Sequence, residues 1–253
     1  MISCEKQQGD SIFVTVSDIG LNHIKNHIPN QDAASFFIMD NDFVLAVSDG
    51  VGSCLKAEVG SKLAITATTT VFSCLKERGL VPNIQNTVVQ IISEWKSMLK
   101  GERINDYCAT LKGAMKIGNR LLLFSIGDGF LVFSSGDTKI SVPFDNELFV
   151  NQTVCLNEHV TESDFWTAEL VLDELVSYVV FVCTDGVFNG IQEGKEIELA
   201  HEIETNTSLG SLKNDLEMFV SMLSEFSSDD RTLGVVKYEK NNAKSDRRNN
   251  SNC

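Results

Sequence analysis

The feature that most constrains this chain is an apolar strand that ends in Asp-Gly, and it occurs twice. The stretch "FVLAVSDGV" runs through Asp49, and "YVVFVCTDGV" runs through Asp185. In each, an apolar run typical of a buried strand is followed by a hydroxyl residue, then Asp-Gly and Val. Asp-Gly is a common turn sequence, so either site alone is interpreted more simply as a turn than as a catalytic or metal-binding carboxylate.

Other aspartates stand at comparable points of the chain. Asp128 lies between glycines in "SIGDGF", at the turn of an expected hairpin, and Asp32 precedes an apolar run in "NQDA". Asp229 and Asp230 come directly before the last apolar run, "TLGVVKY". Since buried strands lie side by side in a core, their ends cluster, and carboxylates there would repel one another strongly. A cation would relieve that repulsion, and an all-oxygen ligand set suits a hard ion such as Mg²⁺ or Mn²⁺.

The apolar periodicity changes along the chain from that of strands to that of helices and back. The order is strands, two helices, strands, a helix and a final strand, which is not the alternation of a doubly wound parallel sheet. It predicts an α+β fold, with antiparallel sheets and helices packed outside them. The expected strands span residues 11–17, 35–39, 43–48, 178–183 and 232–238, with more between 109 and 140; the expected helices span 61–76, 84–99 and 212–226.

The ends of the predicted domain follow from composition. We expect a single domain over residues 1–238, because no linker or internal repeat interrupts it. Residues 239–253, "EKNNAKSDRRNNSNC", are polar without apolar periodicity, which predicts a disordered tail. The region 140–175 carries no motif that we can interpret.

Charge and cysteine content exclude several classes of protein. The formal net charge of −14 argues against a nucleic-acid-binding surface, which needs clustered Lys and Arg. The longest strongly apolar stretch, residues 175–183, is far too short to span a bilayer as a helix, and the first ten residues lack the apolar segment of a secretory signal. Seven scattered cysteines without a CxxC pair are typical of reduced thiols. We therefore expect a cytoplasmic protein that binds neither nucleic acid nor membrane.

Five stretches taken together resemble a known family. "NQDA", "VSDGVGS", "IGDGFLVF", "CTDGVF" and "SSDDRTLGVV" occur in the order found in the metal-dependent Ser/Thr protein phosphatases, the protein phosphatase 2C family. The stretch "GLNHIKNHIPNQDA" is most similar to the compact bacterial branch. The resemblance implies a central β-sandwich of two antiparallel sheets flanked by helices. It also implies a phosphoprotein substrate that carries phospho-Ser or phospho-Thr, and a cognate Ser/Thr kinase system.

The resemblance also implies roles for individual residues. Asp49 would bridge two ions, Mn²⁺ or Mg²⁺, and Gly50 would offer its carbonyl to one of them. Asp185 and Asp229 would complete the shell of the second ion. We prefer Asp229 to Asp230, because it stands three residues before the Ser/Thr of its motif, as the acid of the family does.

The remaining acids have weaker implied roles. Asp128 would help Asp185 to hold a third, weaker ion, and Asp32 with Gln31 would hold metal-bound waters. Two ions that share a water lower its pKa, so the water itself is the nucleophile and Asp49 and Asp185 are catalytic through the ions. The region 140–175 corresponds to the insertion that shapes substrate access in the family.

Three positions depart from the family pattern. His27 stands where many members have a phosphate-binding Arg, so we expect His23 or Lys25 to contact the substrate phosphate; an exposed polar loop is the alternative. Val51 stands where animal members have a His proposed as general acid. Asn189 replaces an Asp that helps some members to hold the third ion.

The sequence leaves three functions open. The first is an active phosphoprotein phosphatase, which the acids at 49, 185 and 229 favour, since buried carboxylates are costly to keep without a cation. The second is a pseudophosphatase of the same fold that binds a phosphoprotein without turnover. The third is a metal-dependent hydrolase of small phosphoesters.

Overall fold

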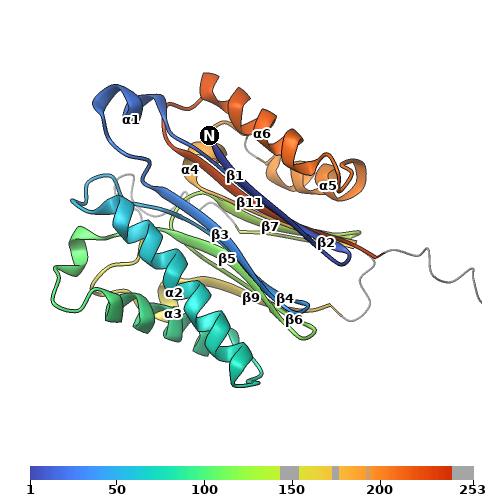
Figure 1. Cartoon of the computed structure of the whole chain (residues 1–253), viewed down its shortest axis with the longest axis horizontal. Coiled ribbons are helices and arrows are strands. Elements are labelled where there is room, and N and C mark those ends of the chain that lie inside the picture. The colour runs from blue at the N-terminus through green and yellow to red at the C-terminus, as the bar shows by residue number, and fades with distance from the viewer. Residues whose placement is uncertain (143–153, 173–176, 193, 241–253) are drawn as a thin grey trace, which may run out of the picture.

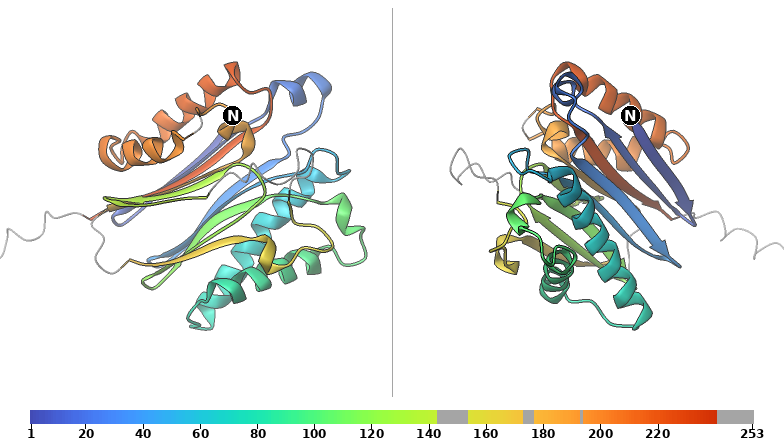
Figure 2. Two further views of the ribbon diagram at one scale, coloured as in Figure 1. Left: turned by 180° about the vertical axis from the view of Figure 1, so that it is seen from behind. Right: turned by 60° about the vertical axis from the view of Figure 1, so that its left-hand side comes forward.

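The protein is a sandwich of two β-sheets with helices outside both, as Figures 1 and 2 show. The computed structural model describes residues 1–142, 154–172, 177–192 and 194–240. The first sheet has the strand order β1 (Ile2–Gln8), β2 (Ser11–Asp18), β11 (Arg231–Glu239), β10 (Ser177–Cys183), β7 (Phe130–Ser135) and β8 (Thr138–Ser141). The second has the order β3 (Asp32–Met39), β4 (Asp42–Asp49), β5 (Leu111–Ile117), β6 (Arg120–Ile126) and β9 (Trp166–Val171). All of these neighbours pair antiparallel, which confirms the expected α+β fold class.

Each sheet is covered by its own helices. The second sheet carries α2 (Ala57–Glu77) and α3 (Ile84–Met98), and the first carries α4 (Asp185–Phe188), α5 (Glu196–Asn206) and α6 (Leu212–Met222). The short helix α1 (Leu21–Asn26) lies at one end of the sandwich, and single 3₁₀ turns span Ile104–Asp106, Glu162–Asp164 and Leu223–Glu225. The result is four layers, helix–sheet–sheet–helix, with three buried interfaces.

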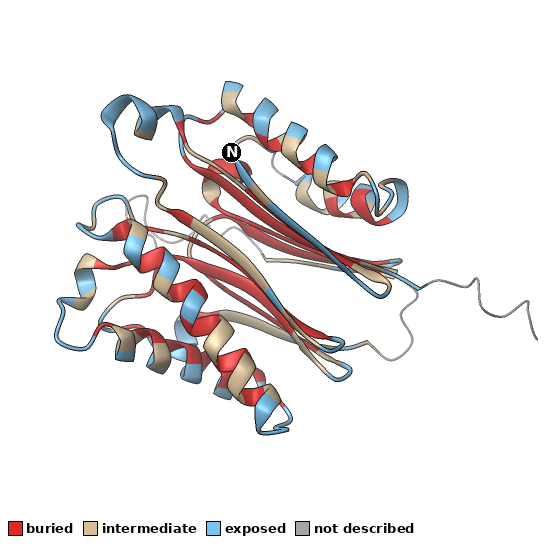
Figure 3. Cartoon of the chain, viewed as in Figure 1, coloured by how far each residue is buried: buried red, intermediate tan, exposed pale blue. Residues whose placement is uncertain are grey.

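The central strands are apolar on both faces because both faces are covered. In β10, Tyr178, Val180 and Val182 pack between the two sheets, while alternate residues such as Phe181 pack against the helices. The period of two sends successive side chains to opposite sides, so a strand with two buried faces becomes a continuous apolar run. Figure 3 shows the buried colour along these strands and on the inner sides of the helices.

The long helices agree with the predicted ones. The predicted helix 61–76 is α2, which starts four residues earlier, and 84–99 is α3, whose N-terminus is capped by the Asn83 side chain accepting from Asn86 N at 3.1 Å. The predicted helix 212–226 is shorter: α6 ends at Met222 and a 3₁₀ turn follows. Phe226, expected on the core-facing stripe, is 71% exposed, because the change of helix type rotates it off that stripe.

One prediction was wrong in its topology. The stretch around Asp128 was expected to be the turn of a hairpin, but β6 belongs to the second sheet and β7 to the first. The turn therefore crosses from one sheet to the other. Gly127 and Gly129 both have φ near +90°, which lets the chain reverse and change sheet within three residues.

Several elements had no sequence signal that we recognised. Strand β1 is polar because it is an edge strand whose residues are almost all exposed, and it pairs only with β2. Helix α5 buries only three residues, Ala200, Ile203 and Glu204, so its apolar periodicity is weak. Helix α1 buries none.

Two predicted regions lie partly outside the described residues. Within 140–175, residues 143–153 and 173–175 are not described, and the described part holds the end of β8, a 3₁₀ turn and β9. Strand β11 continues to Glu239, and residues 241–253 of the predicted tail are not described. The division into a domain over 1–238 and a tail stays a prediction. In the described part of the chain, no helix has the length and apolarity needed to cross a membrane.

Replacing Leu45 by Ala should destabilise the sandwich. Leu45 is fully buried in β4, and its side chain fills the space above Gly234 on the facing sheet, where a Cβ would lie 2.8 Å from Leu45 Cδ1. We expect the free energy of unfolding to fall by about 2–5 kcal/mol in urea denaturation. Val171→Ala, at a position that is 59% exposed on β9, is the control and should change it by less than about 0.5 kcal/mol.

Candidate metal centre

Three predicted aspartates meet at one end of the sandwich. Asp49 ends β4 of the second sheet, Asp185 follows β10 of the first, and Asp128 lies in the turn between the sheets. One carboxylate oxygen from each lies within 4.8 Å of the other two. Asp32 begins β3 and stands directly opposite Asp49 in the register. The two sheets thus bring together four acids that are far apart in the sequence.

The glycines after two of these acids let other backbone segments approach closely. A Cβ at Gly186 would lie 1.9 Å from the carbonyl oxygen of Asp230, and one at Gly50 would lie 2.3 Å from that of Ala57. No larger residue fits either position without moving the backbone. The glycine of each Asp-Gly pair therefore allows a neighbouring backbone segment to pack directly against the residue after the acid, in addition to allowing a turn.

Hydroxyl groups fix the backbone around the acids. Thr110 Oγ1 accepts from Asp49 N at 2.9 Å, and Thr110 N donates to Asp49 O at 2.7 Å. Thr184 Oγ1 donates to Asp32 Oδ2 at 2.8 Å. The hydroxyl residue before Asp185 in the repeated motif therefore orients a carboxylate from the opposite sheet.

The acids raise one another's pKa. Burial, followed by the charges of Asp128 and Asp229, raises the pKa of Asp185 to about 7. Burial also raises the pKa of Asp49, and the charges of Asp32 and Asp185 add to it. The pKa of Asp32 is raised by burial, which the Thr184 hydrogen bond offsets in part. Each shift has the sign expected for carboxylates that lack a counter-charge.

Asp32 supplies a direct sign of a missing partner. Its Oδ1 is buried and has no hydrogen-bond partner, although such atoms are normally satisfied. The neighbouring group of Asp49, Asp128 and Asp185 offers only carboxylate oxygens, which hard divalent cations prefer. The residues present therefore fit one or more ions of the Mg²⁺ or Mn²⁺ type.

The adjacent acids Asp229 and Asp230 face different partners. Asp230 is buried, and its carboxylate accepts from Gly20 N at 2.7 Å, Gln31 N at 2.6 Å and His23 Nδ1 at 2.8 Å. Asp229 is exposed, and its charge acts on Asp185. The oxygens of Asp230 are thus engaged in holding α1 and Gln31. An oxygen of Asp229 lies within 4.8 Å of ligand atoms of Asp230 and His23, and the Asp229 charge also reaches Asp185.

The two predicted phosphate contacts lie on α1. His23 is tied to Asp230 through Nδ1, and Lys25 is exposed. His27, at the position of the family Arg, is the C-cap of α1 with φ of 56°, and its backbone N–H closes the helix. The structure places α1 beside Asp229 by the bond from Asn22 N to Ser228 O.

Lys112 is the main site residue that the sequence analysis missed. It lies on β5, is 1% exposed, and burial lowers its pKa to about 8, against the attraction of Asp128 and Asp49. No clear sequence signal marked it, because β5 carries two lysines, Lys112 and Lys116, and only the fold shows which of them is buried. Thr110, which fixes Asp49, carried no signal of its own.

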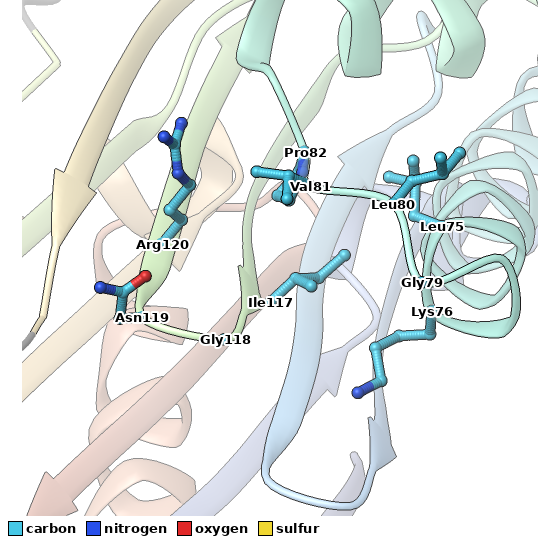
Figure 4. Close-up of a pocket in the computed structure, with 10 residues that line it drawn as sticks. All are labelled: Leu75, Lys76, Gly79, Leu80, Val81, Pro82, Ile117, Gly118, Asn119 and Arg120. Atoms are coloured by element: carbon cyan, nitrogen blue, oxygen red, sulfur yellow. The ribbon is translucent and has the colours of Figure 1, made fainter.

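A separate cavity lies away from these acids. Its volume is about 260 Å³, and Figure 4 shows it between the end of α2, the segment that joins α2 to α3, and the β5–β6 turn. The cavity lies at the end of β4 that is opposite to Asp49. Ile117 lines the cavity, and the residue before it, Lys116, pairs with Phe43 at the start of β4. None of the described residues that line the cavity carries a carboxylate, so this lining does not suit a hard cation.

Comparison with known proteins settles the family. The sequence model described as protein phosphatase 2C matches residues 19–221. The chain belongs to the protein phosphatase 2C family. Its enzyme class is therefore that of the protein-serine/threonine phosphatases, as the motifs predict. A sequence comparison with curated proteins finds no match.

Solved structures share the fold at low sequence identity. RsbX in complex with magnesium is 12% identical with a TM-score of 0.66, over 94% of this chain and 100% of that chain. The catalytic domain of PstP in complex with two manganese ions is 17% identical with a TM-score of 0.65, over 90% and 97%. The Mycobacterium tuberculosis phosphatase PstP/Ppp is 16% identical with a TM-score of 0.67, over 91% and 99%. These likenesses confirm the protein phosphatase 2C fold.

The metal-free phosphatase should lose stability as pH rises from about 4 to about 7. The folded-state pKa of Asp185 is raised above its ordinary value, so over this range the folded protein holds a proton that the unfolded chain releases. We expect the melting temperature in chelator to fall by roughly 5 °C or more across the range.

Two controls identify the source of that pH dependence. Asp185→Asn should make the slope shallower, and added Mn²⁺ should raise the melting temperature most at the high end. A melting temperature that stays flat or rises with pH in the wild-type protein would contradict the electrostatic account of the site.

Proposed function

We propose that this protein is a metal-dependent phosphoprotein phosphatase that hydrolyses phospho-Ser and phospho-Thr with a water activated by two divalent ions, Mn²⁺ or Mg²⁺. The observation that carries the proposal is the meeting of Asp49, Asp128 and Asp185 within 4.8 Å, next to a buried Asp32 oxygen without a partner. The magnesium in the RsbX structure and the two manganese ions in the PstP structure support the choice of metal.

The chain's own residues divide the work of holding the ions. The charges of Asp32, Asp128 and Asp185 all act on Asp49, which would contact both ions, with the Gly50 carbonyl as a further ligand of one. Asp185 and Asp229 would hold the second ion, since the Asp229 charge reaches Asp185 and Asp230 is engaged elsewhere. Asp32 and Gln31 would orient ion-bound waters. Asp128 would hold a third, weaker ion.

Two divalent ions, when bound, supply Lewis acidity that lowers the pKa of a shared water and neutralises phosphoryl oxygens. The protein positions the ligands, through Thr110 at Asp49 and Thr184 at Asp32, before the reaction begins. Val51, next to Gly50, cannot exchange a proton. The leaving oxygen must therefore take its proton from solvent or from a group outside this position.

The substrate side of the site is α1 and the segment around Asp229. Lys25 and His23 are the cationic or proton-bearing groups there, and we assign them to the substrate phosphate. The formal charge of −14 disfavours nucleic acid as a partner. A phosphoprotein substrate implies a Ser/Thr kinase that forms it, and both fit a cytoplasmic protein.

Asp185→Asn should abolish turnover without unfolding the protein. We expect hydrolysis of p-nitrophenyl phosphate and of a phosphothreonine peptide to need Mn²⁺ or Mg²⁺ and to fall by roughly a hundredfold or more in the variant. The melting temperature in chelator should be equal to or higher than that of the wild type, because one repelling charge is gone. Asp215→Asn, at an exposed position on α6, is the matched control and should leave activity unchanged.

The same assay separates the other functions that the sequence leaves open. Binding of a phosphopeptide without turnover under any metal would replace our proposal by a pseudophosphatase. Turnover of p-nitrophenyl phosphate and nucleotides, with none of phosphopeptides, would replace it by a hydrolase of small phosphoesters.

Lys25→Met tests the phosphate contact. Removing an exposed cation beside the site should raise KM for the phosphothreonine peptide by roughly two- to fivefold and leave kcat unchanged, because a surface charge pair contributes little. Lys6→Met on the exposed edge strand β1 is the control. Equal kinetics for the Lys25→Met variant and the wild type would remove Lys25 from the substrate site.

A further inference from the structure

A buried lysine lies beneath the acid cluster. Lys112 points from β5 toward the turn that carries Asp128, and its side chain is 1% exposed. Its Nζ donates to the carbonyl oxygen of Gly127 at 2.9 Å, to that of Asp128, and more weakly to that of Ile126 at 3.5 Å. An ammonium has three N–H donors. All three are directed at successive carbonyls of one turn.

That turn needs support from outside itself. It crosses from β6 of the second sheet to β7 of the first, and Gly127 and Gly129 both have positive φ. Three consecutive carbonyls directed at one point repel one another, so this conformation is unfavourable without a cation at that point. Lys112 supplies the cation. The turn in turn determines where the Asp128 carboxylate lies relative to Asp49 and Asp185.

The charge of Lys112 also acts on the cluster directly. The carboxylates of Asp128, Asp49 and Asp185 all attract the ammonium. Its N–H donors are directed at the carbonyls of the turn. Lys112 therefore acts on the acids through its charge and through the backbone that carries Asp128.

We propose that Lys112 is a positioning residue for Asp128: it holds the turn 127–129 in the conformation that makes Asp128 a metal ligand together with Asp49 and Asp185. The inference deepens the proposed function and rests on it for the presence of the ion. Lys112 itself touches neither the ion nor the substrate. Its effect on metal binding must pass through Asp128.

The chain contains a matched control for a lysine with a purely structural role. Lys237 on β11 is 2% exposed, and its Nζ donates to three carbonyls at the end of α5, those of Ile203 at 3.0 Å, Glu204 at 2.8 Å and Thr207 at 2.6 Å. Lys237 therefore makes the same kind of contact at a place where no predicted metal ligand lies. Lys237→Met should lower stability and leave Mn²⁺ binding unchanged.

The test is a double-mutant cycle on Mn²⁺ binding. Dissociation constants are measured by calorimetric titration of chelator-stripped protein for the wild type, Lys112→Met, Asp128→Asn and the double variant, with circular dichroism to confirm folding. In the wild-type background, Asp128→Asn should weaken the binding of the weakest Mn²⁺ that the titration resolves by roughly tenfold. In the Lys112→Met background, the same change should alter it by less than about twofold, because Asp128 is already displaced.

Removing the Lys112 charge can change Mn²⁺ affinity by itself. This change is common to both proteins of the Lys112→Met background, so it cancels when the effect of Asp128→Asn is compared between backgrounds. If Asp128→Asn weakens Mn²⁺ binding by the same factor with and without Lys112, or has no effect in the wild type, the proposal is overturned. Should Lys112→Met fail to fold, the cycle is run with Lys112→Gln, which keeps N–H donors without the charge and should also reduce the effect of Asp128→Asn.

The outcome can be told apart from failure of the proposed function. A wild-type protein that binds no Mn²⁺ ends both proposals at the first titration. A protein that binds Mn²⁺ but hydrolyses no phosphoester loses the proposed function, while the cycle still decides the role of Lys112. An active phosphatase with equal factors in the two backgrounds loses only the inference about Lys112.

Discussion

Mutual repulsion of carboxylates at the end of a buried sandwich is the constraint on which the site depends. Unit charges 4.8 Å apart repel by about 3.5 kcal/mol at an effective dielectric of about 20, and the Asp49, Asp128 and Asp185 oxygens are no farther apart than this. Three such pairs approach about 10 kcal/mol, which is comparable to the whole stability of a domain. Without a cation the acids avoid this cost by holding protons, as the raised pKa values of Asp185 and Asp49 indicate, and a bound cation compensates their charges and lets them ionise.

The surrounding structure supplies the rest of the compensation. The Thr110 hydroxyl accepts a hydrogen bond from Asp49 N, and the Thr184 hydroxyl donates one to the Asp32 carboxylate. Lys112 donates hydrogen bonds to the carbonyls of the turn that joins the sheets. Asp230, just before β11, holds α1 through Gly20 N and His23 Nδ1 and holds the backbone at Gln31 through a third hydrogen bond. The Thr110 contact joins neighbouring segments of the second sheet, whereas the Thr184 and Lys112 contacts join segments from both sheets or reach the turn between them. The site is thus a product of the sandwich closing on itself, which explains why its ligands are spread over the whole chain.

The sequence predicted the parts of the site that follow from local pattern. Asp49 and Asp185 end apolar runs, and their place at strand ends needed no knowledge of the partner strands. The turn at Asp128 was predicted, but its change of sheet was not, because a hairpin and a sheet-to-sheet turn share the same glycines. Lys112 was missed because its role depends on carbonyls fifteen residues away. The polar strand β1 was missed because an exposed edge leaves no alternation to detect.

The most direct measurement of the central claim is anomalous diffraction at the manganese absorption edge from crystals soaked in Mn²⁺. The account predicts two peaks, both within coordination distance of Asp49, one of them shared with Asp185 and Asp229, and any third, weaker peak beside Asp128. Absence of a peak at Asp49, with ions bound elsewhere or not at all, would show that these acids were not brought together to hold a metal.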